Sequence, residues 1–276
     1  MRIGIIGAGQ IGGTLTRRLT ALGHEVSVAN SRGPETLSDL AKETRARAVS
    51  AREAAERGEV VVVTIPEGRI PQLPKDLFAG VPESVVVVDS GNYYPRQRDG
   101  RIAEIEAGRP ESRWVERQLG RPVVKAFNNI YARHLLERGR PREAPDRIAL
   151  PVAGDDSAAK TVVMQLVEQL GFDAVDAGGL DESWRQQPGT PVYTTDLNAE
   201  GVRRALRESR QLPEAGLMCS TPSKNSAAQS VFSWLRFYSS IAISAVSGLF
   251  WLFRVRTGRA SSLTARPKTV VFEPHE

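Results

Sequence analysis

Short apolar runs alternate with amphipathic stretches along most of the chain. Strands are predicted at residues 2–6, 25–29, 46–50, 60–66, 85–89, 122–127, 148–153 and 172–176. Helical patterns lie between them, at residues 35–45, 51–57 and 157–170. A run of consecutive β-branched residues, as at 60–63, is expected of a central strand buried on both faces. The alternation predicts the α/β class, with a doubly wound, mostly parallel sheet of the Rossmann-like NAD(P)-binding kind.

The first strand leads directly into a glycine motif, Gly7-Ala8-Gly9-Gln10-Ile11-Gly12, and then into a helical pattern. In a dinucleotide site the first glycine permits a tight turn, the second lets backbone approach the pyrophosphate, and the third lets helix and strand pack closely. The helix would direct its free N–H groups at the phosphates. Gly7, Gly9, Gln10, Ile11 and Gly12 are therefore candidate cofactor-binding residues.

The end of the second strand indicates which dinucleotide binds. NAD sites usually present an acidic residue to the ribose hydroxyls there, but this chain has Asn30, Ser31 and Arg32. A hydroxyl and a guanidinium suit a 2′-phosphate through charge-assisted hydrogen bonds. The pattern favours NADP over NAD, and the alternative is that Arg32 is a solvated loop arginine.

The loops after the later strands are expected at the same edge of the sheet, where ligands of such folds bind. Ile65 and Pro66 end the fourth strand and would form a wall for the nicotinamide. Asn92 and Asn128 follow the fifth and sixth strands, and their amides can donate and accept hydrogen bonds. The alternative for both asparagines is a purely structural role in a turn.

Composition and charge exclude several classes of function. The hydrophobic fraction of 41% and charged fraction of 25% are ordinary for a globular protein. The single cysteine, Cys219, fits a reducing compartment, and no secretory signal precedes the first strand, so a cytoplasmic location is predicted. The net charge of +5 is concentrated after residue 212, which argues against nucleic-acid binding. No two of the three histidines are spaced as metal ligands, so no metal is expected.

The last quarter of the chain changes character. Three segments are predicted: an NADP-binding oxidoreductase domain at 1–211, a linker rich in Pro, Ser, Thr and Ala at 212–230, and a short hydrophobic helix with a basic tail at 231–276. Residues 237–253 carry no charge, and basic residues follow them. Three interpretations stay open: membrane contact or anchoring, a packing or dimerisation helix, and a tail without a specific function.

The motifs together resemble one family. The glycine motif, Ala29-Asn30-Ser31-Arg32-Gly33-Pro34, the strand ending Ile65-Pro66 and Val124-Lys125-Ala126-Phe127-Asn128 are similar to the NADPH-dependent coenzyme F420 reductases. The resemblance implies hydride exchange between NADP(H) and an 8-hydroxy-5-deazaflavin, or a flavin as in the related NADPH domain of six-transmembrane metalloreductases. It also implies a homodimer.

The chemistry of such a reaction requires few protein groups. Hydride transfer between two planar cofactors needs mainly stacking and exclusion of water, so no catalytic residue is assigned. Two alternatives to the deazaflavin or flavin acceptor remain. One is an NADPH-dependent imine or 2-hydroxy acid reductase, and the other is a non-catalytic NADPH-binding module.

Overall fold

The computed structural model describes residues 1–210 of the chain. The predicted linker, the hydrophobic helix at 237–253 and the basic tail lie outside the described residues, and so does Cys219. The three interpretations of the tail therefore stay predictions. No helix within residues 1–210 is long and apolar enough to cross a bilayer.

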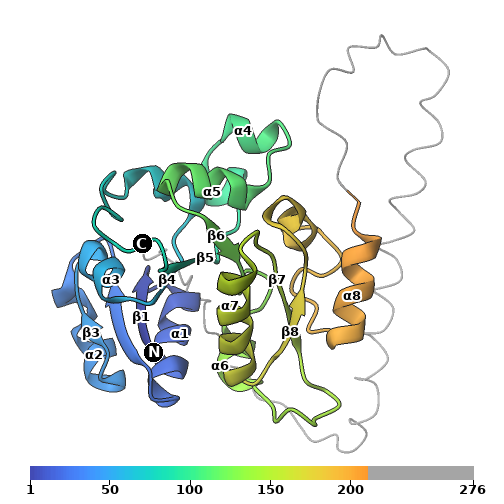
Figure 1. Cartoon of the computed structure of the whole chain (residues 1–276), viewed down its shortest axis with the longest axis horizontal. Helices are drawn as coiled ribbons and strands as arrows, with labels where there is room; N and C mark the ends of the chain where they lie inside the picture. The colour runs from blue at the N-terminus through green and yellow to red at the C-terminus, as the bar shows by residue number, and fades with distance from the viewer. Residues whose placement is uncertain (211–276) are drawn as a thin grey trace, which may run out of the picture. The chain divides into compact units, whose positions relative to one another are not determined.

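A six-stranded parallel sheet forms the centre of the fold (Figure 1). Its strands lie in the order β3-β2-β1-β4-β5-β6, in which the direction of chain progression reverses between β1 and β4. This order is that of the dinucleotide-binding fold, whose ligands bind at the reversal point, outside the carboxyl ends of the strands. The strands are β1 (Arg2–Ile6), β2 (Glu25–Ala29), β3 (Arg47–Ala48), β4 (Val60–Val63), β5 (Val86–Asp89) and β6 (Val123–Lys125).

Helices cover both faces of this sheet, as the alternating pattern predicts. The α-helices are α1 (Gln10–Ala21), α2 (Ser38–Thr44), α3 (Ala51–Arg57), α4 (Ala103–Glu106), α5 (Glu111–Leu119), α6 (Ala132–Glu137), α7 (Ser157–Gln169) and α8 (Ala199–Glu208). Short 3₁₀ turns add η1 (Pro34–Leu37), η2 (Glu67–Gln72) and η4 (Leu180–Gln186), and η3 (Pro95–Asp99) is a single π turn.

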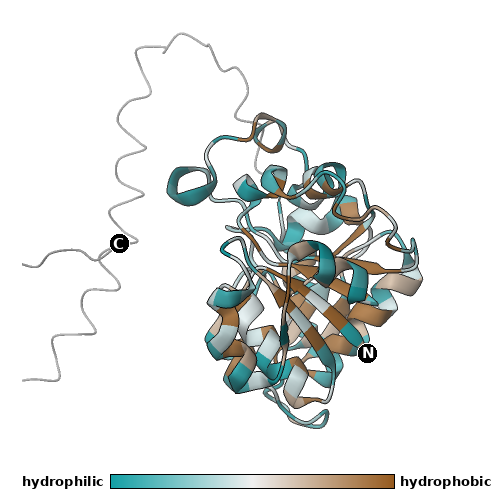
Figure 2. Cartoon of the chain, turned by 90° about the vertical axis from the view of Figure 1, so that its left-hand side faces the viewer, coloured by the Kyte–Doolittle hydropathy of each residue, from teal (hydrophilic) through white to brown (hydrophobic). Residues whose placement is uncertain are grey.

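Strand β4 shows why helices cover both faces of the sheet. Val60 and Val62 belong to one buried apolar cluster, together with residues of α1 and α7. Val61 and Val63 belong to a second cluster on the opposite face, together with residues of α3 and α5. All four valines are buried, which accounts for the uninterrupted β-branched run in the sequence. Figure 2 shows the same pattern, with hydrophobic strands inside and hydrophilic residues on the outer surfaces of the helices.

The last two strands depart from the expected single sheet. β7 (Ala149–Val152) and β8 (Asp173–Asp176) pair in parallel with each other as a separate two-stranded sheet. One antiparallel bridge, between Lys125 of β6 and Ala153, connects it to the main sheet. The sequence predicted both strands correctly, but their assignment to one continuous doubly wound sheet was wrong. A strand's own residues fix its pairing partner only weakly, because pairing depends on the connections and on packing around it.

The polar stretch between β6 and β7 is partly helical. Residues 132–137 form α6, which packs beside α1. Arg147, at the end of the stretch, is buried and forms ion pairs with Glu168 and Asp173. The stretch is therefore anchored at both ends against the rest of the fold.

Candidate functional site

The glycine motif forms a tight junction between β1 and α1. Gly7 has a φ of 111°, a conformation that a residue with a side chain rarely adopts. A Cβ placed on Gly12 would lie 1.8 Å from the carbonyl oxygen of Gly7. Two of the three glycines are therefore required by the chain's own packing, as the sequence analysis predicted.

Gly9 differs from these two because no neighbouring atom in the described part of the chain requires a glycine there. A Cβ on Gly9 would meet nothing within 4 Å, so the residue borders open space. It is also the N-cap of α1, and no side chain accepts a hydrogen bond from the first turn. The first N–H groups of a helix have no intrahelical partner, so the start of α1 offers backbone donors to an anion at a place where the backbone is bare.

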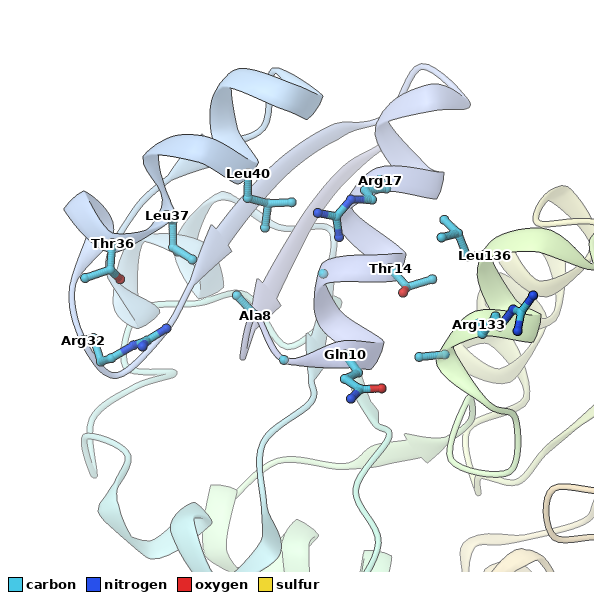
Figure 3. A pocket seen from close by; sticks show the side chains of 13 residues that line it. Ala8, Gln10, Thr14, Arg17, Arg32, Thr36, Leu37, Leu40, Arg133 and Leu136 are labelled. Atoms are coloured by element: carbon cyan, nitrogen blue, oxygen red, sulfur yellow. The ribbon is translucent and has the colours of Figure 1, made fainter. Parts of the chain in front are cut away.

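A cavity of about 440 Å³ opens at this helix start (Figure 3). It is bordered by the glycine motif and α1, by the loop after β2 with η1 and α2, and by α6. The lining residues are Ala8, Gly9, Gln10, Gly13, Thr14, Arg17, Arg32, Thr36, Leu37, Leu40, Ala132, Arg133 and Leu136. Gly9, Gln10 and Arg32 are thus the sequence-predicted residues that line it.

Arg32 is the exposed cation on the side of the pocket formed by the β2 loop. Its side chain extends from the loop toward the start of α1 (Figure 3). Within residues 1–210 its guanidinium has no ion-pair partner, whereas the backbone N–H of Arg32 donates to Asn30 Oδ1 at 2.9 Å. Asn30 Nδ2 in turn donates to Thr36 Oγ1 at 2.8 Å. Asn30 therefore shapes the loop, Arg32 remains available to a ligand, and Ser31 is exposed beside them.

A second arginine in the pocket is already paired. Arg17 of α1 forms two hydrogen bonds with the Glu43 carboxylate of α2, at 2.7 and 2.8 Å. The bonds from this guanidinium lower the pKa of the Glu43 carboxyl, and the pKa of Arg17 is raised. Arg17 therefore serves first to join α1 to α2. Arg133 is likewise paired with Glu137, so Arg32 is the lining arginine that has no ion-pair partner among residues 1–210.

Ile65 and Pro66 follow β4 beside the glycine motif. The Ile65 Cγ2 atom would lie 2.7 Å from a Cβ on Gly7, so the β4 loop is packed directly on the β1 turn. Pro66 is the N-cap of η2 and is partly exposed. Both residues lie at the switch between β1 and β4, where the sequence analysis expected them.

The two candidate asparagines bond to each other. Asn92 Nδ2 donates to the carbonyl oxygen of Asn128 at 2.9 Å, and Asn128 Nδ2 donates to Asn92 Oδ1 at 3.0 Å. Asn128 also exchanges hydrogen bonds with Gln186 of η4, and it is only 3% exposed. Its amide therefore ties β6 to η4. Asn92 is partly exposed and is the better placed of the two for a ligand, so a cofactor contact of either stays a prediction.

Further polar and aromatic residues gather near η4 and α6. The hydroxyls of Tyr94 and Tyr193 form a hydrogen bond, and burial is the main cause that raises the pKa of Tyr193. His134 of α6 lies 2.6 Å from the Asp196 carboxylate, measured from Nδ1 to Oδ2. Trp184 stacks under Arg185, with the guanidinium carbon 4.7 Å from the ring centre. Tyr193, Trp184 and Arg185 therefore have contacts within the fold.

Several lining residues were not predicted from the sequence. Thr14 and Arg17 follow Gln10 at helical spacing, so the helical period alone could have placed them on one face of α1. Arg133 and Leu136 of α6 had no such signal, because the packing of α6 beside α1 joins segments far apart in the sequence. No cluster of His, Cys, Asp or Glu within the described part of the chain could hold a metal ion.

Comparisons with known proteins agree with this geometry. The family model described as "NADP oxidoreductase coenzyme F420-dependent" matches residues 2–93, which include β1 to β5 and the glycine motif. Protein YjhV of Escherichia coli K12 is 49% identical over 86 residues, which are 31% of this chain and 56% of that protein. The match therefore spans about half the length of this curated relative.

Two solved structures extend the likeness beyond the motif. The hypothetical protein SMa0349 of Sinorhizobium meliloti is 32% identical, with a TM-score of 0.60, over 72% of this chain and 95% of that one. A "putative F420 dependent NADP-reductase" of Arthrobacter sp. FB24 is 24% identical, with a TM-score of 0.54, over 65% of this chain and 86% of that one, and shows the shared fold. Residues 2–93 belong to the family of coenzyme F420-dependent NADP oxidoreductases, and the chain as a whole is a relative of SMa0349.

Proposed function

We propose that the protein is an NADPH-dependent oxidoreductase that transfers a hydride between NADP(H) and a deazaflavin of the coenzyme F420 type or a flavin. The observation that carries the proposal is the pocket at the start of α1, at the switch point of a parallel sheet. Within residues 1–210, nothing covers the Gly9 backbone there and the Arg32 guanidinium has no ion-pair partner. The family membership supports the cofactor class. The acceptor is proposed from the family's description and from the small demand that such chemistry makes on the protein.

Arg32 supports NADP rather than NAD as the cofactor. The β2 loop carries no acidic residue between Ala29 and Pro34, the segment that would approach the adenosine ribose. A planar guanidinium can bond two oxygens of a 2′-phosphate at once. The hydrogen bonds of Asn30 hold the loop in place before any ligand binds, which reduces the cost of ordering it.

Gly9 and the start of α1 would bind the pyrophosphate. The open space at Gly9 fits close approach by a bulky anion, and the helix supplies N–H donors and the positive end of its dipole. Gln10 borders the same space and can donate through its amide. These residues bind and orient; none of them has to gain or lose a proton.

The loops after β4 and β5 would hold the nicotinamide end of NADPH. When bound, NADPH supplies the hydride. Pro66 and Ile65 present apolar surface at the switch point and would exclude water from one side of the ring. The Asn92 amide, held by the carbonyl oxygen of Asn128, would fix the orientation of a polar edge. Position and exclusion of water are the main contributions that a cofactor-to-cofactor transfer requires.

An acceptor screen tests the proposal. The purified full chain is mixed with NADPH and, in separate reactions, with oxidised coenzyme F420, FMN, FAD, a keto acid or a cyclic imine, and the loss of nicotinamide absorbance is followed. Turnover with F420 or a flavin is the expected result. Turnover with the keto acid or imine alone would contradict the proposed acceptor, and tight NADPH binding without any turnover would contradict an enzymatic role.

A further inference from the structure

Four ionisable side chains lie together in the interior, beneath α5. Lys125 ends β6, Asp89 ends β5, Glu67 begins η2 after β4, and Glu111 begins α5. All four are buried, and the side chains of Lys125 and Glu67 have no exposed surface. Charged residues are almost never fully buried unless they are paired, so this group, the Lys125 cluster, requires an explanation.

The lysine is paired with one carboxylate. Lys125 Nζ lies 3.0 Å from Asp89 Oδ2 and donates to the carbonyl oxygen of Gly91 at 2.7 Å. The Ser112 hydroxyl donates to the same Asp89 oxygen at 2.8 Å. The backbone N–H of Gly91 donates to the other Asp89 oxygen at 2.8 Å. Asp89 therefore has the partners that an ionised carboxylate needs in a buried site.

The two glutamates have no such set of partners. Glu67 Oε1 and Glu111 Oε2 each lie 4.0 Å from Lys125 Nζ, which is beyond a hydrogen bond. Neither oxygen of Glu67 has a hydrogen-bond partner in the described part of the chain, and Glu111 Oε2 has none. Three ionised carboxylates around one ammonium would leave an excess of two negative charges away from water, which is far more costly than neutral acids.

Within residues 1–210, the other polar groups around the cluster do not supply a second cation to the two glutamates. Asp99 of η3 accepts hydrogen bonds from the backbone of Gly68 and Tyr94, and its carboxylate pairs with Arg98. Burial raises the pKa of Asp99, but these bonds together hold it below its ordinary value. Asp99 thus adds negative charge on the Glu67 side, and Tyr193 adds a phenol. Tyr93 adds a phenol and a backbone N–H that hydrogen-bonds to Glu111 and acts to lower the pKa of that carboxyl.

The pKa shifts of the two glutamates and of Lys125 agree with this geometry. Burial, followed by the charge of Glu111, raises the pKa of Glu67 well above its ordinary value. Burial also raises the pKa of Glu111 to about 8, although Lys125 opposes the change. Burial acts to lower the pKa of Lys125, but the surrounding carboxylates outweigh it and raise the pKa.

We infer that Glu67 and Glu111 are protonated carboxylic acids in the folded protein at neutral pH, so that the cluster holds one ion pair and stores two protons. The cluster is a positioning device for the cofactor site. Lys125 holds the Gly91 carbonyl, and the next residue, Asn92, lies in the loop at the expected nicotinamide end. Glu67 directly follows Pro66. Loss of the protons would place negative charge behind both loops.

Infrared spectroscopy of the cofactor-free full chain tests the proton content directly. A protonated carboxylic acid has a carbonyl stretch that is distinct from the carboxylate bands. We expect this band at pH 7, a loss of part of it in Glu67→Gln and in Glu111→Gln, and no loss in Glu83→Gln, a control at an exposed carboxylate. No such band at pH 7, or a band unchanged in both buried variants, would overturn the inference.

Melting temperatures give a second measurement that does not require cofactor. Glutamine has the shape and neutral charge of a protonated glutamic acid and takes up no proton on folding, so at pH 7 Glu67→Gln and Glu111→Gln should melt at or above the wild-type melting temperature. Asp89→Asn removes the charge that balances Lys125 and should lower the melting temperature by more than about 6 °C. A larger loss in both glutamine variants than in Asp89→Asn would contradict the assignment.

The link to the cofactor site rests on the proposed function and is tested separately. The affinity for NADPH is measured between pH 7 and pH 9.5 in the wild type and in the double variant that combines Glu67→Gln and Glu111→Gln. The wild type is expected to lose affinity several-fold across this range, and the double variant to lose clearly less. Equal losses would overturn the positioning role. If NADPH does not bind at all, the proposed function fails, whereas the infrared result on the protons stands by itself.

Discussion

Two polar regions lie at the carboxyl edge of the sheet. One exposes its charge to water, and the other buries its charged groups. In the open pocket at α1, Arg32 is exposed and Gly9 borders empty space. In the Lys125 cluster beneath α5, Lys125 and Glu67 have no exposed side-chain surface. Water solvates the charge in the pocket until a ligand arrives, whereas the fold itself must satisfy the cluster. Changes in the pocket should therefore affect binding, and changes in the cluster should affect stability.

The largest effect should come from removing the buried cation. Lys125→Met leaves Asp89 without its 3.0 Å partner in the interior, and we expect a loss of about 3–5 kcal/mol in the free energy of unfolding. Urea titration at pH 7 measures it. The double variant Lys125→Met, Asp89→Asn should recover part of the loss, because it removes both charges together. A change below about 1 kcal/mol in the single variant would show that the pair is not needed by the fold.

The glycine motif allows a matched pair of substitutions. Gly12→Ala would place a methyl group 1.8 Å from the Gly7 oxygen, so a loss of about 3 kcal/mol or more in stability is expected. Gly9→Ala meets no protein atom and should leave stability within about 0.5 kcal/mol, while NADPH binding weakens because the methyl group enters the ligand's space. Thermal melts and titration calorimetry measure the two effects. A Gly9→Ala protein that binds NADPH normally would contradict the pyrophosphate assignment.

Arg32→Ala should affect only the recognition of the phosphate. Charge-assisted hydrogen bonds contribute about 1.5–3 kcal/mol, so the Michaelis constant for NADPH should rise on the order of 10- to 100-fold. The constant for NADH and the stability should change little. Arg204→Ala, an exposed arginine of α8 outside the pocket, is the control. Equal effects on NADPH and NADH would show that Arg32 does not bind the 2′-phosphate.

The cluster also predicts how stability depends on pH. The pKa of Glu111 is about 8 in the folded protein and ordinary in the unfolded chain, and that of Glu67 is raised as well. The folded state therefore binds more protons above the ordinary glutamate pKa of about 4.3, so stability is fully present below it and is lost as pH rises toward and through 8. The slope approaches roughly 1.4 kcal/mol per pH unit for each proton. Urea titrations at several pH values should show a smaller slope of unfolding free energy against pH in Glu111→Gln than in the wild type.

The smallest effect is expected at the ion pair of the pocket wall. Glu43→Gln removes the exposed ion pair with Arg17. Ion pairs on the surface contribute between zero and about 1 kcal/mol to the free energy of unfolding. Melting temperature should barely change. A large loss of stability would mean that α2 depends on this contact, and the contrast between the two regions would have to be revised.

The two regions also differ in how far the sequence could predict them. The strand, glycine and helix pattern around Gly7 and Gly12 depends on neighbours in the chain, so local rules predicted the junction of β1 with α1 and the fold class correctly. The Lys125 cluster brings together the last residues of two strands, one residue that follows a third strand and one that begins a helix. Periodicity shows which residues share a face of one element, but not which elements meet, and so neither the cluster nor the contact of Asn128 with Gln186 could be predicted.

The separate pairing of β7 with β8 could not be predicted for the same reason, because periodicity does not show which elements meet. Both strands were recognisable from their apolar residues, but the choice of partner depends on α7 and α8, which pack against them. Sequence spacing carried no information on that choice.

The most direct test of the account is calorimetric titration of the full chain with NADPH and with NADH under identical conditions. The account predicts that NADPH binds at least about 10-fold more tightly, through the contacts of the 2′-phosphate with Arg32 and its loop. Equal affinities, or no binding of either nucleotide, would contradict it.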